Sequence, residues 1–317
     1  MSNKQRMVFI TPTWAGDLDH FRVMRASLEQ SPLAGFDHYV VVQHEDIALF
    51  EEFRERSGLT LLSTRDVLPE DIEHRRNCAR QISQRLGRKM TRICGSLKRI
   101  FSRPDWPSYT GWHTQQLCKL ILASELEYDK AVIIDSDVIV TPYASYNDFV
   151  SDIGYVCFAD WQSRTGLKGK VKKWIHESEY LIDTVSSTTE VNAYFDTPFV
   201  FDRQLLCEAL KTLESNTDKV WYTALLDRPP RRWSEFGIYK AYLMQQTSKV
   251  SIDWRIPSFC HYLYDTSNSQ TVVETVGELL TKPDIHYVTI HSQASGRELR
   301  DASAYLEPIL SLIQKDG

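Results

Sequence analysis

The chain has few of the features that mark secreted, membrane-spanning or modular proteins. Its six cysteines are scattered with no close pair, which argues against a disulfide framework and against a thiolate zinc site. No apolar run approaches the roughly 20 residues that span a bilayer, and no apolar signal core precedes the first predicted strand. We therefore expect a cytoplasmic protein.

Internal repeats, low-complexity tracts and a clean interdomain linker are also missing. The net charge of −5 gives no general reason to expect a nucleic-acid partner. The chain has 317 residues, of which 42% are hydrophobic, so it can bury a sizeable core. We expect one domain over residues 1–317 with a variable second half.

Strand-like and helix-like segments alternate in the first part of the chain. The apolar runs Met7–Pro12, Tyr39–Val42 and Leu59–Leu62 are typical of buried strands, and His20–Gln30 and Ile47–Ser57 of the helices between them. This alternation favours a parallel sheet with crossover helices. Further helices are expected at Trp112–Leu126, Leu205–Leu213, Glu235–Gln245 and Ala302–Ile313, strands at Tyr155–Ala159 and Phe199–Phe201, a basic loop at Ser163–Lys173, and an irregular region after about residue 250.

The segment 72–103 is a basic helical insertion. Its apolar residues recur every three or four positions, and ten Lys or Arg residues but no Asp or Glu occur between His74 and Arg103. Basic amphipathic helices lie on anionic membrane surfaces, so the segment permits a peripheral contact with the inner face of a membrane. The alternatives are a core-packed helix with a cationic outer face and a helix that pairs with an acidic partner chain.

Asp135 and Asp137 directly follow the buried strand Ala131–Ile134. Ligands of open α/β sheets gather outside the carboxyl ends of the strands, and alternate residues of an extended segment point the same way. Two carboxylates there need a compensating cation, and Mg²⁺ or Mn²⁺ prefers such oxygen ligands together with phosphates. The pattern therefore predicts a divalent metal site. The alternative is an Asx turn at a strand end.

The run Ile-Ile-Asp-Ser-Asp-Val, preceded by a helix with Trp112, Gln115, Gln116 and Lys119, resembles the centre of the GT-A glycosyltransferases. The chain is also similar to an uncharacterised bacterial family with that fold, whose members open with a Thr-Pro-Thr strand end, here residues 11–13, and carry a Trp-x-x-Gln-Gln-x-x-Lys helix. The resemblance implies a GT-A (Rossmann-like) α/β fold, a mostly parallel sheet flanked by helices.

The resemblance also implies a function. It indicates transfer of a sugar from a nucleotide-sugar donor to a glycan or lipid-linked acceptor, as in bacterial surface polysaccharide synthesis. Residues 1–140 would form the nucleotide-binding half and residues 141–317 the acceptor-binding half. Asp137 would bind Mn²⁺ or Mg²⁺ directly, and Asp135 would contact the ribose or the metal. A late histidine often completes the metal shell of GT-A enzymes, and His291 is favoured over His286. The alternative is a hydrogen-bonded histidine at a strand end.

Several further residues are candidates for substrate contacts. The hydroxyls of Thr11 and Thr13 and the carboxylate of Asp46 follow predicted strands, where they can bind a base or ribose. Turn chemistry or helix capping explains them equally well. The full set of substrate-binding candidates is Thr11, Thr13, Asp46, Trp112, Gln116, Lys119, Ser136, Thr197 and Pro198.

An inverting transferase needs a base for the acceptor hydroxyl. Asp160, after a predicted strand, and Glu235, after the cap-like Ser234, are the candidates, although helix capping alone explains Glu235. The cationic loop with Arg228, Arg231 and Arg232 can neutralise phosphate or be solvated surface.

Two other functions fit part of the pattern. A phosphatase of the haloacid dehalogenase type also places Asp-x-Asp after an apolar strand, with Asp135 as nucleophile and Asp137 as acid. That signature usually starts its domain, whereas strand and helix segments precede it here. A non-catalytic sugar- or nucleotide-binding protein is the second alternative, because the 11% aromatic content suits carbohydrate stacking.

Overall fold

The structure is a computed structural model that describes residues 5–100, 111–184, 188–229, 231–295 and 302–315. A five-stranded sheet lies at its centre, in the order β3 (Leu59–Ser63), β2 (Asp37–Val42), β1 (Met7–Thr13), β4 (Lys130–Ile133) and β9 (Phe199–Asp202). The first four strands are parallel and β9 is antiparallel to β4. The expected α/β fold with a mostly parallel sheet is therefore confirmed.

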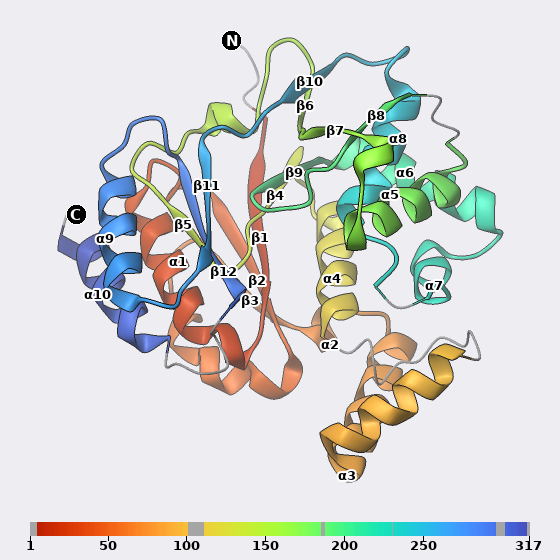
Figure 1. The fold of residues 1–317 in the computed structure, drawn as a ribbon, viewed down its shortest axis with the longest axis horizontal. Coiled ribbons are helices and arrows are strands. Elements are labelled where there is room, and N and C mark those ends of the chain that lie inside the picture. Colours follow the sequence, from red (N-terminus) through yellow and green to blue (C-terminus); the bar gives the residue numbers. More distant parts are fainter. Residues whose placement is uncertain (1–4, 101–110, 185–187, 230, 296–301, 316–317) are drawn as a thin grey trace.

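Helices cover both faces of this sheet (Figure 1). On one side lie α1 (Leu18–Gln30), α9 (Ser269–Leu280) and α10 (Ser303–Lys315), and on the other lie α4 (Trp112–Glu125), α6 (Arg203–Thr217) and α8 (Glu235–Gln246). The strands β1 and β4 are buried along their whole length, which explains their continuous apolar runs, since strands covered on both faces do not alternate.

Three smaller sheets complete the second half. They pair β11 (Cys260–Asp265) with β12 (Tyr287–Ser295) and β12 with β5 (Val138–Val140), β10 (Ile252–Arg255) with β6 (Tyr155–Phe158), and β7 (Trp161–Ser163) with β8 (Glu190–Asn192). Because β5 directly follows the two aspartates and pairs antiparallel with β12, a late segment of the chain lies beside Asp137.

Three sequence predictions about elements are wrong. The region after residue 250 is regular, with β10, β11, α9 and β12. The strands β10 and β11 are only half-buried and bear no clear alternation, so the sequence pattern did not reveal them. The predicted loop Ser163–Lys173 ends early, because α5 (Gly169–Ile182) begins inside it. The predicted helix Ile47–Ser57 is a 3₁₀ helix, η2 (His44–Phe53).

The remaining short helices connect these layers: η1 (Ala15–Asp17) follows β1, α2 (Thr64–Val67) follows β3, and α7 (Trp221–Leu226) follows α6. The predicted basic helix is α3 (Glu70–Ile100), which is interrupted at Gly87 with φ 73° and projects from the body of the molecule (Figure 1). No helix of the described segments is both long enough and apolar enough to cross a bilayer.

Candidate functional site

The Asp135-Ser136-Asp137 segment leaves β4 at the carboxyl edge of the parallel strands and lines an open cleft of about 530 Å³. We call this the acidic cleft, because Asp17, Asp135, Asp137 and Asp196 all line it. Its walls come from the loop after β1, from α4, from α5, and from the segments before β9 and within β12. The predicted residues that meet there are Trp112, Gln116, Lys119, Asp135, Ser136, Asp137 and His291.

Lys119 on α4 links the cleft wall to the interior. Its Nζ lies 2.9 Å from Oδ1 of Asp135 and 3.3 Å from Oε1 of Glu235. The side chain of Asp135 is 41% exposed, whereas that of Glu235 is 2% exposed. The amide of Gln116 also faces Glu235 and donates to its carboxylate when the nitrogen is turned toward it. Asp135 is thus held in position by a buried polar group behind it.

Burial and charge shift the pKa values of Lys119 and Glu235 in opposite directions. Burial by itself would lower the pKa of Lys119, but the attraction of Asp135 and Glu235 outweighs it and raises the pKa. Burial raises the pKa of Glu235, and Lys119 only partly counters that effect. Lys119 therefore stays charged at neutral pH and fixes Asp135.

His291 and Asp196 face the same cleft from the second half of the chain. The ring of His291 stacks on Tyr264 with centroids 4.5 Å apart, and its buried Nε2 has no hydrogen-bond partner among the described residues. Burial lowers the pKa of His291 although Asp196 opposes the shift, so the ring is neutral at pH 7 and can act as a ligand. Burial raises the pKa of Asp196.

Sequence reasoning did not identify Asp196. It comes immediately before Thr197-Pro198, at the start of the antiparallel strand β9, so it lies at the same edge as the ends of the parallel strands. The sequence shows an acidic residue just before a predicted strand. Only the antiparallel pairing of β9 with β4 reveals that this end of the strand lies at the cleft.

The donor chemistry of the cleft fits a hard divalent cation. Mg²⁺ in proteins is held by one or two carboxylates together with phosphate and water, and Asp135, Asp137 and the unpartnered Nε2 of His291 supply oxygen and nitrogen donors. The described residues contain no preassembled group of three or more such side chains.

Several predicted residues lie elsewhere. Thr11 is completely buried, its hydroxyl donates to the Ile134 carbonyl at 2.7 Å, and it does not line the cleft, so its contact with a nucleotide stays a prediction. Thr13 is also buried, without a hydrogen-bond partner for its hydroxyl among the described residues. Asp46 accepts a hydrogen bond from the backbone N–H of Ala15 at 3.0 Å and orders the loop after β1.

The two predicted bases are not in the cleft. Asp160 is exposed and accepts a hydrogen bond from Gln162 at 2.5 Å. Glu235 is buried behind Lys119 and cannot reach an acceptor there. Thr197 and Pro198 are buried next to Asp196 and do not line the cleft. The Nδ1 atom of His286 lies 3.0 Å from both carboxylate oxygens of Asp148, as the strand-end alternative predicts.

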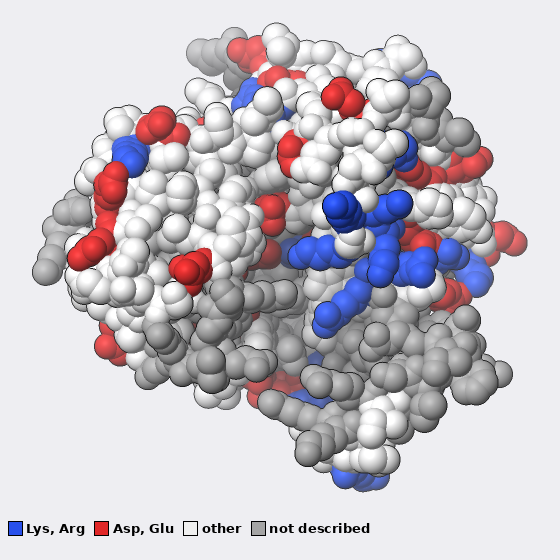
Figure 2. Space-filling model, viewed as in Figure 1, with Lys and Arg blue, Asp and Glu red and all other residues white. Residues whose placement is uncertain are grey.

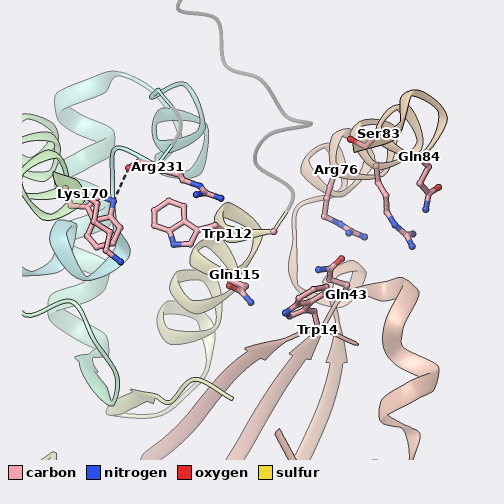
Figure 3. Close-up of a pocket in the computed structure, with 13 residues that line it drawn as sticks. Trp14, Gln43, Arg76, Ser83, Gln84, Trp112, Gln115, Lys170 and Arg231 are labelled. Atoms are coloured by element: carbon pink, nitrogen blue, oxygen red, sulfur yellow. Dashed lines mark hydrogen bonds between the residues drawn. The ribbon is translucent and has the colours of Figure 1, made fainter. Parts of the chain in front are cut away.

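A second cleft of about 900 Å³ adjoins the first and shares Trp112, Gln115, Lys170 and Trp174 with it. We call it the basic cleft, because Arg76, Arg80, Lys170 and Arg231 line it and, in the part of the chain that the structure describes, no acidic residue does. Figure 3 shows Lys170, Trp112 and Arg231 on one side and Arg76, Ser83 and Gln84 on the other. Lys and Arg side chains also gather on the surface over α5 (Figure 2).

A family model matches most of the chain, but the family's description names no activity. The model of the "Family of unknown function (DUF6492)" matches residues 10–263, and no curated protein matches the chain. Among solved structures, a complex of the galactosyltransferase LgtC with donor and acceptor sugar analogs is similar at 11% identity and a TM-score of 0.44, over 98% of this chain and 96% of that one. The apo bifunctional glycosyltransferase WbbM is similar at 8% identity and a TM-score of 0.44, over 99% of this chain and 50% of that one. Similarity this low leaves the chemistry of the site to its own side chains.

Proposed function

The chain belongs to the DUF6492 family of unknown function, and we propose that it is a metal-dependent GT-A glycosyltransferase. It would move a sugar from a nucleotide-sugar donor to a glycan or lipid-linked acceptor, as in surface polysaccharide synthesis. The observation that carries the proposal is the acidic cleft, in which Asp135 and Asp137 at the end of β4 lie with His291 and Asp196 in one open space. Donor sites of open α/β sheets lie at this edge.

The chain's own residues have distinct tasks in this mechanism. Asp137 and His291 would hold the metal, which supplies Lewis acidity to the leaving diphosphate when bound. Lys119 is bonded to Asp135 and Glu235, so it orients the Asp135 carboxylate rather than binding phosphate itself. The ammonium of Lys170 lines the same cleft and can offset negative charge on the leaving group.

Asp196 replaces Asp160 and Glu235 as the proposed base. It is the carboxylate that faces the cleft from the acceptor-binding half, and burial raises its pKa toward the range in which a carboxylate accepts a proton efficiently. An inverting transfer would need such a group beside the acceptor hydroxyl. Asp196→Asn would then lower kcat by about 100-fold and leave nucleotide binding unchanged.

The first experiment is a thermal-shift panel of nucleoside diphosphates with and without Mn²⁺, on the wild type and on Asp137→Asn. A ligand at 100 times its Kd stabilises the native state by about 2.7 kcal/mol. We expect one nucleotide to raise the melting temperature only with metal, and Asp137→Asn to abolish this shift and lower turnover at least about 100-fold. Asp152→Asn is the matched control, because Asp152 is exposed and lines neither cleft.

Other outcomes would favour the alternatives. A panel without any metal-dependent shift would contradict the proposal. Release of phosphate from a simple phosphomonoester, without sugar transfer, would favour the phosphatase with Asp135 as nucleophile. Nucleotide or sugar binding without turnover of any donor would favour a non-catalytic binding protein.

We also propose that α3 contacts the surface of an anionic membrane. Its residues Ile82 and Leu86 before the break at Gly87, and Met90 and Ile93 after it, are 44–52% exposed, so apolar side chains are exposed on both parts of a basic helix that projects from the body. Such a helix binds anionic bilayers through buried apolar area and charge together.

Flotation with liposomes tests this membrane contact. The wild type should float with phosphatidylserine-containing liposomes and not with neutral ones. The double variant Ile82→Glu, Leu86→Glu should stay at the bottom of the gradient. Leu49→Glu is the matched control, since Leu49 is an exposed apolar residue on η2 and not on α3. Equal flotation of both variants would contradict the contact.

A further inference from the structure

The two adjoining clefts have opposite charge. Four aspartates line the acidic cleft, whereas the described residues that line the basic cleft include four cations and no carboxylate. Three tryptophans, Trp14, Trp112 and Trp174, also line the basic cleft. Cations together with indole faces form a surface that suits a ligand with a negative charge and a flat apolar face, which is the chemistry of an acidic sugar.

The cations of the basic cleft are not equivalent. Arg76 is paired with Glu73 and Glu45, and Arg80 is paired with Glu45 at 2.7 Å, so the wall formed by α3 is neutralised. On the opposite wall, no carboxylate of the described residues lies within ion-pair distance of Lys170 or Arg231, although the charge of Lys170 acts on Asp196 from farther away. A ligand anion would therefore be attracted to the wall formed by α5 and the loop before α8.

Lys170 and Arg231 are joined through an aromatic wall. The indole N–H of Trp174 donates to the carbonyl of Arg231 at 3.1 Å (Figure 3), and the Nζ of Lys170 lies 5.2 Å from the Trp174 ring centroid. Trp112 stacks on Trp174, with centroids 5.9 Å apart and planes 7° apart. Arg231 has φ 53°, a backbone conformation uncommon for a residue other than glycine. Such strain accumulates at ligand sites, and here it directs a cation beside the aromatic pair.

The position of this wall connects it to the proposed reaction. Trp112, Gln115, Lys170 and Trp174 line both clefts, so a ligand bound in the basic cleft reaches the acidic cleft without leaving the protein surface. The acceptor of a glycosyl transfer must meet the donor in this way.

We propose that the basic cleft binds the acceptor and that the acceptor is an acidic glycan. Its carboxylate or phosphate would lie at Lys170 and Arg231, and its sugar ring would pack along the Trp112 and Trp174 wall. This inference rests on the proposed function, since it names the substrate class for that site.

Calorimetric titration with three probes tests the inference: trigalacturonate, its neutral counterpart galactotriose, and galactose 1-phosphate. We expect the acidic probes to bind at least about tenfold more tightly than galactotriose, with an affinity that falls as salt is raised. The carboxylate and the phosphate probe together identify which anion the site takes. Arg231→Gln and Lys170→Gln should each weaken acidic-probe binding about tenfold, because each removes one charge-assisted contact. Lys172→Gln is the matched control: Lys172 is an exposed cation on the same helix and lines neither cleft.

The outcomes separate this inference from the proposed function. Nucleotide binding with Mn²⁺ is measured on Arg231→Gln in parallel, because Arg231 lines only the basic cleft. Suppose that nucleotide binds but acidic and neutral glycans bind equally tightly, or that Arg231→Gln leaves the affinity for both glycans unchanged. The acidic acceptor is then wrong, whereas the proposed transferase activity is not contradicted. If Arg231→Gln reduces flotation with phosphatidylserine liposomes and leaves glycan binding unchanged, the cation serves a membrane surface and the inference is overturned.

Discussion

Lys119 and its neighbours show what burial does to single polar side chains in this protein. Lys119 and Glu235 are each at most 4% exposed, and the charge of each compensates the charge of the other. Lys119 and Asp135 line the cleft, whereas Glu235 does not. The residue type therefore does not decide the position: Glu235 is bonded to Lys119 behind the cleft, whereas Asp196, another carboxylate, faces the cleft.

His38 on β2 carries a prediction about pH. It is completely buried between Arg25, at 3.2 Å, and the hydroxyl of Thr11, at 2.9 Å. Burial, assisted by Arg25, lowers the pKa of His38 to about 3, whereas an unfolded histidine titrates near pH 6.5. Below that pH the unfolded state binds the extra proton. The contribution of His38 to stability is therefore present above pH 6.5 and is lost as the pH falls toward 3.

When the pH falls from 6.5 to 4.5, we expect the free energy of unfolding of His38→Gln to decrease by about 2 kcal/mol less than that of the wild type. Urea unfolding at both pH values measures this difference. His176→Gln is the control, because His176 is exposed on α5 and should leave the pH dependence unchanged. An identical loss in His38→Gln and the wild type would refute the assignment.

At the scale of elements, the second half of the fold depends on strands that come together from distant parts of the chain. β6 and β10 are parallel neighbours, and Gly154 precedes β6 where the backbone of residue 251 approaches most closely. A Cβ at position 154 would overlap the Ser251 carbonyl group and lie 2.7 Å from its carbon. Backbone cannot move aside as a flexible side chain can.

Gly154→Ala should therefore destabilise the protein by about 1–3 kcal/mol, the usual range for overpacking. Gly35→Ala is the matched control, because a Cβ there meets nothing within 4 Å and its backbone has no positive φ. It should change stability by less than about 0.5 kcal/mol. Chemical denaturation of the two variants measures both values, and equal stabilities would show that β6 and β10 are not this close.

The helices and strands that were predicted correctly have a strong local signal. The run of four apolar residues in β4, and the polar and apolar pattern of α4, are visible in a short window. The strands β10 and β11 are exposed in part along their length, so they lack the alternation of a sheet with one buried face. β10 pairs with β6, which lies far away in the sequence, and β11 pairs with β12, which follows only after α9.

At the scale of the whole molecule, the first and last helices pack together. Val23 on α1 belongs to the same buried cluster as Ile139 on β5 and Ile309 on α10, which is 0% exposed. A larger cluster contains buried side chains from both halves of the chain, among them Phe9, Trp233 and Tyr287. We predict from these clusters that residues 1–317 unfold as one domain.

Ile309→Ala should lower the free energy of unfolding by about 2–5 kcal/mol, because it leaves a cavity between α10 and α1. Ile153→Ala, at a position that is 71% exposed, should have little effect. Differential scanning calorimetry of both variants should show a single transition that shifts as a whole. Separate melting of a C-terminal unit in Ile309→Ala would contradict the single domain.

The sequence by itself determined the alternation of strands and helices, the paired aspartates at a strand end and the basic amphipathic helix, because these depend on neighbours a few positions apart. Only the tertiary structure decided which side chains share a cleft. Asp196 and His291 line the same cleft as Asp137 because β9 runs antiparallel to β4 and β12 pairs with β5. The tertiary structure also decided that Thr11 and Glu235 are buried. Burial follows from packing between distant elements, which no short stretch of sequence specifies.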